Sequence, residues 1–276
     1  MKDCVADGTP LVVVGSGKIA CAIAKRTASW GTFMTPQLST AGGDLTAALM
    51  SLRPSCIVLA AGSPKHAAFV LDHKALYEHI TVTRTVAETA ARLGAFLIFI
   101  SSWLVYEGCS ARVDEQTAPQ PETPYAVMKR LAEQIVLQTS SAVLRCGTVV
   151  GDELAVRNPS VLHRLVAASQ GQQTPCLKND NVAFVHRDDL ASLVHLVARE
   201  TGRGPIYNVA SWTGSLLGLV VYMSGKRDLI AQGESRRPRM TASLVRTAFP
   251  RWAPRSMQTI IDTMRGGVVD AKQAVP

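Results

Sequence analysis

The stretch that decides the fold runs Leu11-Val12-Val13-Val14-Gly15-Ser16-Gly17-Lys18-Ile19-Ala20. Its four apolar residues, three of them β-branched, predict a short strand buried on both faces, as in a parallel sheet. Two glycines follow at once, and a helical pattern then extends from Ile19 to Ala28. The stretch therefore predicts a strand, a tight glycine turn and a helix.

The spacing of the small residues in this turn is typical of a dinucleotide site. Gly15 permits a tight turn, Gly17 lets the backbone approach a pyrophosphate, and Ala20 allows close packing of helix on strand. The N–H groups at the start of the helix then face the anion. An ordinary turn between strand and helix is the alternative. The motif predicts a cofactor site formed by Gly15, Ser16, Gly17, Lys18 and Ile19.

Strands and helices continue to alternate along the chain. Apolar runs predict strands over 56–61, 96–100 and 142–145, with a weaker pattern over 31–34, and helices are predicted over 44–52, 67–94 (with a break near residue 73) and 125–139. This order predicts an α/β fold of the Rossmann type, with a doubly wound parallel sheet. We also expect cofactor contacts after the second clear strand, at Ala60, Ala61 and Gly62.

Loop signals become more frequent after residue 150. We therefore expect a dinucleotide-binding domain over 1–150. Residues 151–276 are expected to form mainly a smaller, mixed substrate lobe, some of whose elements return to the main sheet.

Composition limits the class of protein. The chain has 276 residues, 47% of them apolar and 18% charged, which supplies a core and excludes wholesale disorder. Lys and Arg number 29 against 21 Asp and Glu, and the formal charge of +8 favours an anionic partner. Aromatic residues make up only 5% and form no stripe interleaved with arginine, so a nucleic acid partner is disfavoured.

Neither a membrane span nor a secretory signal is expected. No apolar run approaches the roughly 18 residues that a spanning helix needs, and the first residues lack a basic segment followed by an apolar one. The six cysteines form no Cys-x-x-Cys pair and lie at no metal-binding spacing, so they are interpreted as small buried side chains in a reducing compartment. We expect a cytoplasmic protein without a metal.

The choice of cofactor depends on a missing carboxylate. Between Gly8 and Gly43 there is no Asp or Glu, although an acidic side chain about 20 residues after the glycine turn is usual for binding ribose hydroxyls. Lys18, Lys25 and Arg26 lie near enough in sequence to attract a 2′-phosphate. NAD and NADP both fit, and these charges favour NADP.

A phenol and an ammonium group stand four residues apart at Tyr125 and Lys129, which places them on one face of a helix. A nearby ammonium is expected to lower the pKa of the phenol, which then exchanges a proton with a carbonyl or alcohol oxygen. Twenty-three residues earlier, Ser102 ends a buried strand at the sheet edge where ligands bind. With a dinucleotide turn, Ser102, Tyr125 and Lys129 predict a hydride-transfer site.

Several segments resemble one known family. The run Ser101-Ser102-Trp103-Leu104-Val105-Tyr106 is similar to its Ser-Ser-x-x-Val-Tyr/Phe segment, and Glu115, Pro121 and Tyr125 reproduce a spacing found in one of its groups. Residues 184–190 and 204–209 resemble its Phe-x-His-Val-x-Asp-Leu/Val and Gly-x-Tyr-Asn-Val segments. From about residue 11 to 260 the chain resembles an extended short-chain dehydrogenase/reductase of the NAD-dependent epimerase/dehydratase superfamily. It is most similar to dTDP-4-dehydrorhamnose reductases.

The chain also departs from that pattern. Its glycine loop is one residue shorter than usual, Thr81 stands where asparagine is frequent, and Met128 replaces the serine or threonine that commonly precedes the catalytic lysine. Trp103 and Leu104 occupy the positions at which the related dehydratases carry an acidic pair. Because neither side chain transfers protons, dehydration is not expected.

The resemblance implies a catalytic role for Ser102, Tyr125 and Lys129, with Tyr125 and Lys129 also touching the cofactor. Substrate contacts are expected at Ser102, Trp103, Tyr106, Arg237 and Arg239. Arginine binds phosphate in a bidentate manner, so the basic residues near 237 would suit a nucleotide diphosphate, although a solvated basic loop is the alternative. His186 is expected to cap the helix that follows it.

The leading hypothesis is an NAD(P)H-dependent carbonyl reductase acting on a keto-sugar nucleotide or a related carbonyl metabolite. A 4-epimerase of a nucleotide sugar would use the same three residues. A cofactor-binding regulatory or scaffold subunit without catalysis is the alternative from another class. By resemblance, a homodimer is expected.

Overall fold

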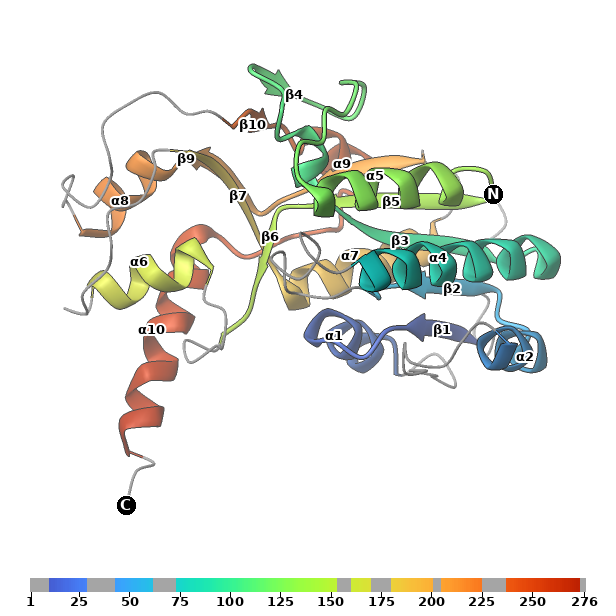
Figure 1. Ribbon diagram of the computed structural model, residues 1–276. Helices are drawn as coiled ribbons and strands as arrows, with labels where there is room; N and C mark the ends of the chain where they lie inside the picture. Colours follow the sequence, from blue (N-terminus) through green and yellow to red (C-terminus); the bar gives the residue numbers. More distant parts are fainter. Residues whose placement is uncertain are drawn as a thin grey trace.

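A parallel sheet of five strands forms the centre of the computed structural model, which describes residues 10–28, 43–61, 73–152, 160–169, 180–200, 205–224 and 237–273. Its strand order is β1-β2-β3-β5-β8 (Figure 1). The strands are β1 (Leu11–Val14), β2 (Cys56–Leu59), β3 (Phe96–Ser102), β5 (Ser141–Cys146) and β8 (Ile206–Val209). Because all the strands are parallel, their carboxyl ends meet at one edge of the sheet, where ligands bind in such folds.

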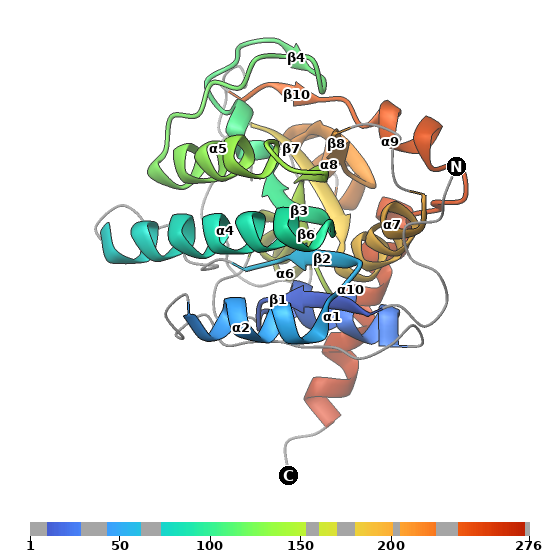
Figure 2. The same cartoon turned by 90° about the vertical axis from the view of Figure 1, so that its right-hand side faces the viewer.

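Helices cover both faces of this sheet, which explains why its strands are apolar on both sides. Alternate residues of β1 enter different cores: Leu11 and Val13 pack on one face, and Val12 and Val14 on the other. The first core includes α1 (Lys18–Thr27), α7 (Arg187–Arg199) and α9 (Ser243–Ala248); the second includes α2 (Gly43–Leu52), α4 (His73–Leu93) and α5 (Pro124–Val136), as Figure 2 shows.

A smaller layer lies beside the main sheet. Its three strands, β6 (Thr148–Val150), β7 (Asn181–His186) and β9 (Trp212–Ser215), follow the order β6-β7-β9, with β9 antiparallel to β7. They share a core with α6 (Val161–Ser169), α8 (Leu216–Ser224) and α10 (Met257–Gln273). The short 3-10 helix η2 (Trp103–Tyr106) and the paired strands β4 (Arg112–Val113) and β10 (Arg239–Met240) pack together in a further cluster.

The predicted Rossmann-type sheet is confirmed, and four of its predicted strands correspond to β1, β2, β3 and β5. The strand predicted over 31–34 and the start of the helix predicted over 67–94 lie outside the described residues; from residue 73 that helix is continuous to Leu93. Although they follow residue 150, β8 joins the main sheet and α7 packs on it.

Two further predictions concern side-chain environment. Cys56, Cys109 and Cys146 are buried free thiols, whereas Cys21 is exposed, so the expectation of burial is wrong for Cys21. Among the described residues, no helix is both long enough and apolar enough to cross a membrane.

Candidate active site

The glycine turn joins β1 to α1, and its first glycine is required by the backbone. Gly15 has φ +139°, which side-chain-bearing residues rarely adopt. A Cβ atom there would lie 2.7 Å from the carbonyl oxygen of Ala60. Because the Ala60 amide also donates to the Val14 carbonyl at 2.9 Å, the turn packs tightly on the end of β2. Two of the segments predicted to bind the cofactor are thus neighbours; Gly62 lies outside the described residues.

Gly17 serves a different purpose in the same turn. It precedes α1 with an ordinary extended backbone, φ −78°, and a Cβ atom there would have no neighbour within 4 Å among the described residues. Ser16, Gly17 and Lys18 are exposed, while Ile19 is partly buried. Within the described part of the chain, the start of α1 therefore leaves room for the pyrophosphate of a dinucleotide beside the free N–H groups of the first helical turn.

Ser102 lies at the carboxyl end of β3, beside Cys146 of β5. It is buried, and its hydroxyl oxygen accepts a hydrogen bond from the backbone amide of Leu104 at 3.3 Å. This bond caps η2, so the serine is held by both the sheet and the short helix. Its side chain also forms a hydrogen bond with Tyr125.

The start of α5 places Tyr125. Thr123 caps the helix by accepting from the Ala126 amide at 3.3 Å, and Pro124 occupies the first helical turn, where its missing N–H costs nothing. One carboxylate oxygen of Glu107 accepts from the amides of Glu122 and Thr123, at 3.0 and 2.5 Å. Glu107 therefore fixes the loop before the helix.

Tyr125 carries a neutral phenol. Burial raises its pKa to about 12; the hydrogen bond with Ser102 lowers the value and Cys146 raises it further. The expectation that Lys129 lowers this pKa is wrong, because burial dominates and the ammonium is 5.9 Å from the ring centroid. A phenol with this pKa keeps its proton at neutral pH, so it can donate that proton to a developing alkoxide.

Lys129 is buried one helical turn beyond Tyr125. Its Nζ donates to the carbonyl oxygen of Ile100 at 3.1 Å and lies 4.9 Å from the centroid of the Phe99 ring. Burial lowers its pKa to about 8, against the opposing effects of Cys146 and Glu133. The structure thus brings Ser102, Tyr125 and Lys129 together at the carboxyl end of β3.

A buried ion pair holds this helix against the sheet. The Glu133 carboxylate, one turn beyond Lys129, accepts from Arg145 Nε at 3.0 Å and from Arg145 Nη2 at 2.8 Å. Ser101 Oγ donates to the same carboxylate at 2.7 Å. Arg145 belongs to β5 and Ser101 to β3, so one carboxylate ties α5 to two neighbouring strands. Sequence reasoning missed Glu133, although its spacing of four from Lys129 places it on the same helix face.

Tyr106 belongs to this buried network rather than to a substrate pocket. The side chain is fully buried, and its hydroxyl accepts from Arg145 and lies 2.7 Å from the Asp114 carbonyl oxygen and 3.2 Å from Asn208 Oδ1. Trp103 is 3% exposed and packs in the apolar cluster of η2 and β10. The predicted substrate contacts at these two residues are therefore corrected to packing roles.

The motif residue Glu115 also forms a hydrogen bond inside the protein. Its carboxylate accepts from the backbone amide of Asn208 at 2.9 Å, and Asn208 Nδ2 donates to the Thr241 carbonyl oxygen at 3.0 Å. Burial raises the pKa of Glu115. Two motif residues far apart in sequence, Glu115 and Asn208, are thus in contact and help to hold the fold together.

The two arginines of the predicted phosphate clamp differ in environment. Arg237 Nε lies 3.7 Å from an Asp180 carboxylate oxygen, and its backbone carbonyl accepts from Asn181 Nδ2 at 2.8 Å. Arg239 is exposed on β10. Asp180 would compete with a phosphate for Arg237, whereas Arg239 is accessible.

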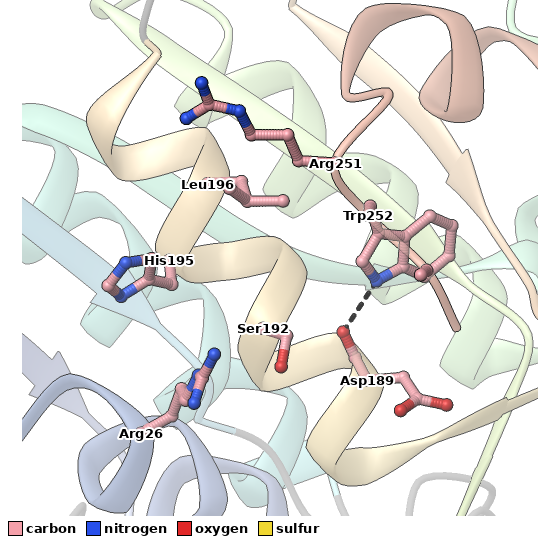
Figure 3. A pocket seen from close by; sticks show the side chains of 8 residues that line it. Arg26, Asp189, Ser192, His195, Leu196, Arg251 and Trp252 are labelled. Carbon is pink, nitrogen blue, oxygen red and sulfur yellow. Dashed lines mark hydrogen bonds between the residues drawn. The ribbon is translucent and has the colours of Figure 1, made fainter. Parts of the chain in front are cut away.

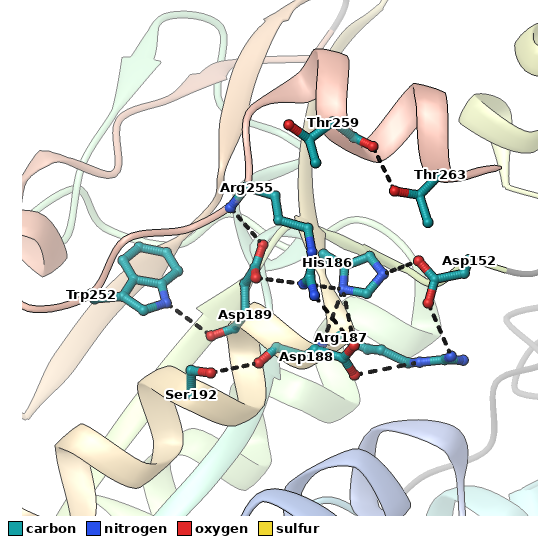
Figure 4. A network of polar contacts seen from close by, with 10 residues as sticks. All are labelled: Asp152, His186, Arg187, Asp188, Asp189, Ser192, Trp252, Arg255, Thr259 and Thr263. Carbon is teal, nitrogen blue, oxygen red and sulfur yellow. Dashed lines mark hydrogen bonds and ion pairs between the residues drawn. The ribbon is translucent and has the colours of Figure 1, made fainter. Parts of the chain in front are cut away.

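His186 caps α7, as predicted, by accepting from the Asp188 amide through Nδ1 (Figure 4). Arg255 Nη1 lies 2.7 Å from the same nitrogen, and because arginine only donates, Nδ1 accepts. Nε2 therefore carries the proton that faces Asp152 at 3.0 Å. Asp152, His186 and Asp188 could group around a cation, but both ring nitrogens are engaged and Arg187 lies 3.7 Å from Asp152.

The sequence model of the NAD dependent epimerase/dehydratase family matches residues 6–210. The chain belongs to this family. The family model covers the glycine turn, Ser102, Tyr125, Lys129 and the β7–α7 segment. The resemblance inferred from the motifs is confirmed.

Solved structures share the fold of this family member across nearly its whole length. MoeE5 in complex with UDP-glucose and NAD superposes with a TM-score of 0.75 at 18% identity, covering 96% of this chain and 100% of that one. dTDP-4-dehydrorhamnose reductase from Bacillus anthracis str. Ames, in complex with NADP, gives a TM-score of 0.71 at 14% identity, covering 95% and 98% of the two chains. At these identities the likeness concerns the fold.

The curated relatives of this family member are named as a subunit of another enzyme. Methionine adenosyltransferase 2 subunit beta from Xenopus laevis is 28% identical over 141 residues, which is 50% of this chain and 42% of that protein. The counterpart from Bos taurus is 34% identical over 141 residues, with the same shares. The matched region spans less than half the length of these relatives.

Proposed function

We propose that this protein is an NAD(P)H-dependent carbonyl reductase acting on a keto-sugar nucleotide or a related carbonyl metabolite. The observation that carries the proposal is the hydrogen-bonded pair Ser102 and Tyr125, with Lys129 one turn away, at the carboxyl edge of a Rossmann-type sheet. Family membership and the solved complexes of similar fold with NAD, NADP and UDP-glucose support it.

Each of the three residues has a separate task in this proposal. Tyr125 donates its proton to the carbonyl oxygen of the substrate as that oxygen gains charge. Ser102 binds the same oxygen and orients the phenol. Lys129 supplies a positive charge at the cofactor ribose and beside the phenol. The dinucleotide, when bound at Gly15–Ile19 and the end of β2, supplies the hydride.

The test compares the wild type with Tyr125→Phe in an assay of dinucleotide absorbance at 340 nm, using a panel of UDP- and dTDP-linked keto sugars with NADH and with NADPH. Loss of the phenol is expected to lower kcat by about 100- to 10,000-fold, the usual contribution of a general acid, while the affinity for the dinucleotide stays within a few-fold. An unchanged kcat would overturn the mechanism. Turnover of a nucleotide sugar without net change in absorbance would assign a 4-epimerase instead.

The names of the curated relatives favour one second candidate, a cofactor-binding subunit of another enzyme. This candidate predicts tight dinucleotide binding without turnover across the carbonyl panel, together with a stable complex with a catalytic partner. Retention of the Ser102, Tyr125 and Lys129 set is the reason for placing the reductase first. Co-purification with a methionine adenosyltransferase catalytic subunit, combined with an absence of turnover, would reverse that order.

A further inference from the structure

A pocket of about 240 Å³ lies between α1, α7 and the segment that leads to α10 (Figure 3). Arg26 of α1 and Arg251 line it, with His195 and Leu196 of α7 between them and the Trp252 side chain nearby. The pocket is built on the α1 and α7 face of the sheet, whereas Tyr125 and Lys129 belong to α5 on the opposite face. It is therefore separate from the proposed active site.

The charges around this pocket do not cancel. Among the residues that the structure describes, neither Arg26 nor Arg251 forms an ion pair with a carboxylate within 4 Å. Asp189 contributes to the wall, but its carboxylate is already bound: one oxygen accepts from Arg255 Nη1 at 2.6 Å and the other from the Arg255 amide at 2.9 Å. Two guanidinium groups thus line a cavity in which the one carboxylate of the described wall, that of Asp189, is already paired with Arg255.

The imidazole in the wall responds to this positive field. The pKa of His195 falls to about 4, first because the ring is desolvated and then because Arg26 and Arg199 are positively charged. His195 is therefore neutral at pH 7, so the positive charges in the pocket wall are those of the two guanidinium groups. Leu196 and Trp252 provide apolar surface between them.

We propose that this pocket binds a small phosphate-bearing anion, attracted by the guanidinium groups of Arg26 and Arg251. Guanidinium groups match the oxygens of phosphate in bidentate geometry, and the pocket wall carries one on each of two elements. The volume is below the roughly 300–1,000 Å³ of sites for drug-sized ligands, so a phosphate or a small phosphate ester fits and a dinucleotide does not.

The proposed site is also distinct from the glycine turn, which binds phosphate in the function proposed above. Lys18 opens α1 and Arg26 lies in its last turn, so at 1.5 Å per residue they are about 12 Å apart along the helix axis. The sequence-based expectation that Arg26 helps to attract a 2′-phosphate stays a prediction beside this second site. The inference does not depend on the proposed reductase activity.

The test measures the thermal unfolding midpoint of the full chain against inorganic phosphate, with sodium chloride keeping the ionic strength constant. Binding to the native state raises the midpoint with ligand concentration, from which a dissociation constant follows. Arg26→Gln and Arg251→Gln are each expected to weaken phosphate binding at least tenfold. Arg26→Lys, which retains the charge without the planar fork, should give a smaller loss.

Two matched variants distinguish phosphate binding in this pocket from attraction to surface charge in general and from binding at the glycine turn. Arg92→Gln removes an exposed arginine from α4 on the opposite face, and Gly17→Ala alters the glycine turn. Arg92→Gln should retain the phosphate response of the wild type. Because the glycine turn is itself proposed to bind phosphate, Gly17→Ala should remove at most a part of the response, and the part that is lost with Arg26→Gln should remain. The proposal is overturned if phosphate gives no response in the wild type, if Arg92→Gln weakens binding as much as Arg26→Gln, or if only Gly17→Ala abolishes the response.

Discussion

At the scale of single residues, Gly15 and Gly17 meet different demands although they stand two positions apart. Gly15 needs a left-handed backbone and has no room for a Cβ atom, whereas Gly17 has an ordinary backbone and no described residue close to where its Cβ atom would be. The first glycine allows the backbone of the turn to pack on β2, and the second leaves space at the start of α1 for the proposed cofactor. The sequence motif indicated a glycine turn but could not distinguish these two roles.

This distinction predicts that one alanine substitution lowers stability and the other weakens dinucleotide binding. Gly15→Ala should lower the free energy of unfolding by about 1–3 kcal/mol, since it forces a strained backbone and a clash with the Ala60 carbonyl. Gly17→Ala should leave that free energy within about 0.5 kcal/mol and weaken dinucleotide binding, because the methyl group fills the expected pyrophosphate space. Chemical denaturation and fluorescence titration with NADH measure the two effects. Equal losses of stability would contradict this account.

A second prediction at this scale concerns pH. Burial lowers the pKa of Lys129 to about 8, so its ammonium group loses its proton as the pH rises through that value, whereas the Tyr125 phenol stays protonated until about pH 12. The value of kcat/KM for the carbonyl substrate, which reports on the protein before that substrate binds, should therefore fall as the pH increases from 7 to 9. A profile that stays flat over this range would show that the charge of Lys129 is not needed.

At the scale of elements, the buried ion pair of α5 and β5 is central. Glu133 is fully buried and bridges Arg145 and Ser101, so the helix that carries Tyr125 and Lys129 has a fixed rotation and register on the sheet. The strands could be predicted from their apolar runs. The bridge could not, because neither a glutamate in an amphipathic helix nor an arginine at the end of an apolar strand shows from sequence alone which side chain it meets.

This bridge predicts that two substitutions, each of which removes one charge, differ in their cost to the free energy of unfolding. Glu133→Gln leaves the buried Arg145 guanidinium without its counter-charge and should cost about 3–5 kcal/mol of unfolding free energy. Arg130 contacts the same carboxylate at 3.2 Å from a partly exposed position, and Arg130→Gln should cost less than about 1 kcal/mol. Urea denaturation of both variants tests the claim. Similar costs would mean that the Glu133–Arg145 pair does not anchor α5.

At the scale of the whole molecule, sequence order explains the sheet and the grouping of Ser102, Tyr125 and Lys129. Parallel strands bring their carboxyl ends to one edge, so residues at those ends become neighbours however far apart they stand in the chain. The substrate contact predicted for Tyr106 came from a motif match. Such a match does not show whether a side chain points into the core or toward a ligand. Sequence order also could not predict the Arg26–Arg251 pocket, because no periodicity relates a residue of α1 to one before α10.

The most direct test of the central claim follows the hydride itself. The wild-type protein is incubated with NADH or NADPH deuterated at C4 and with the keto-sugar nucleotide panel, and the products are analysed by mass spectrometry. The reductase account predicts one deuterium atom on the newly reduced carbon of a product, and loss of that label with Tyr125→Phe. Tight binding of the dinucleotide without deuterium transfer to any substrate would contradict it.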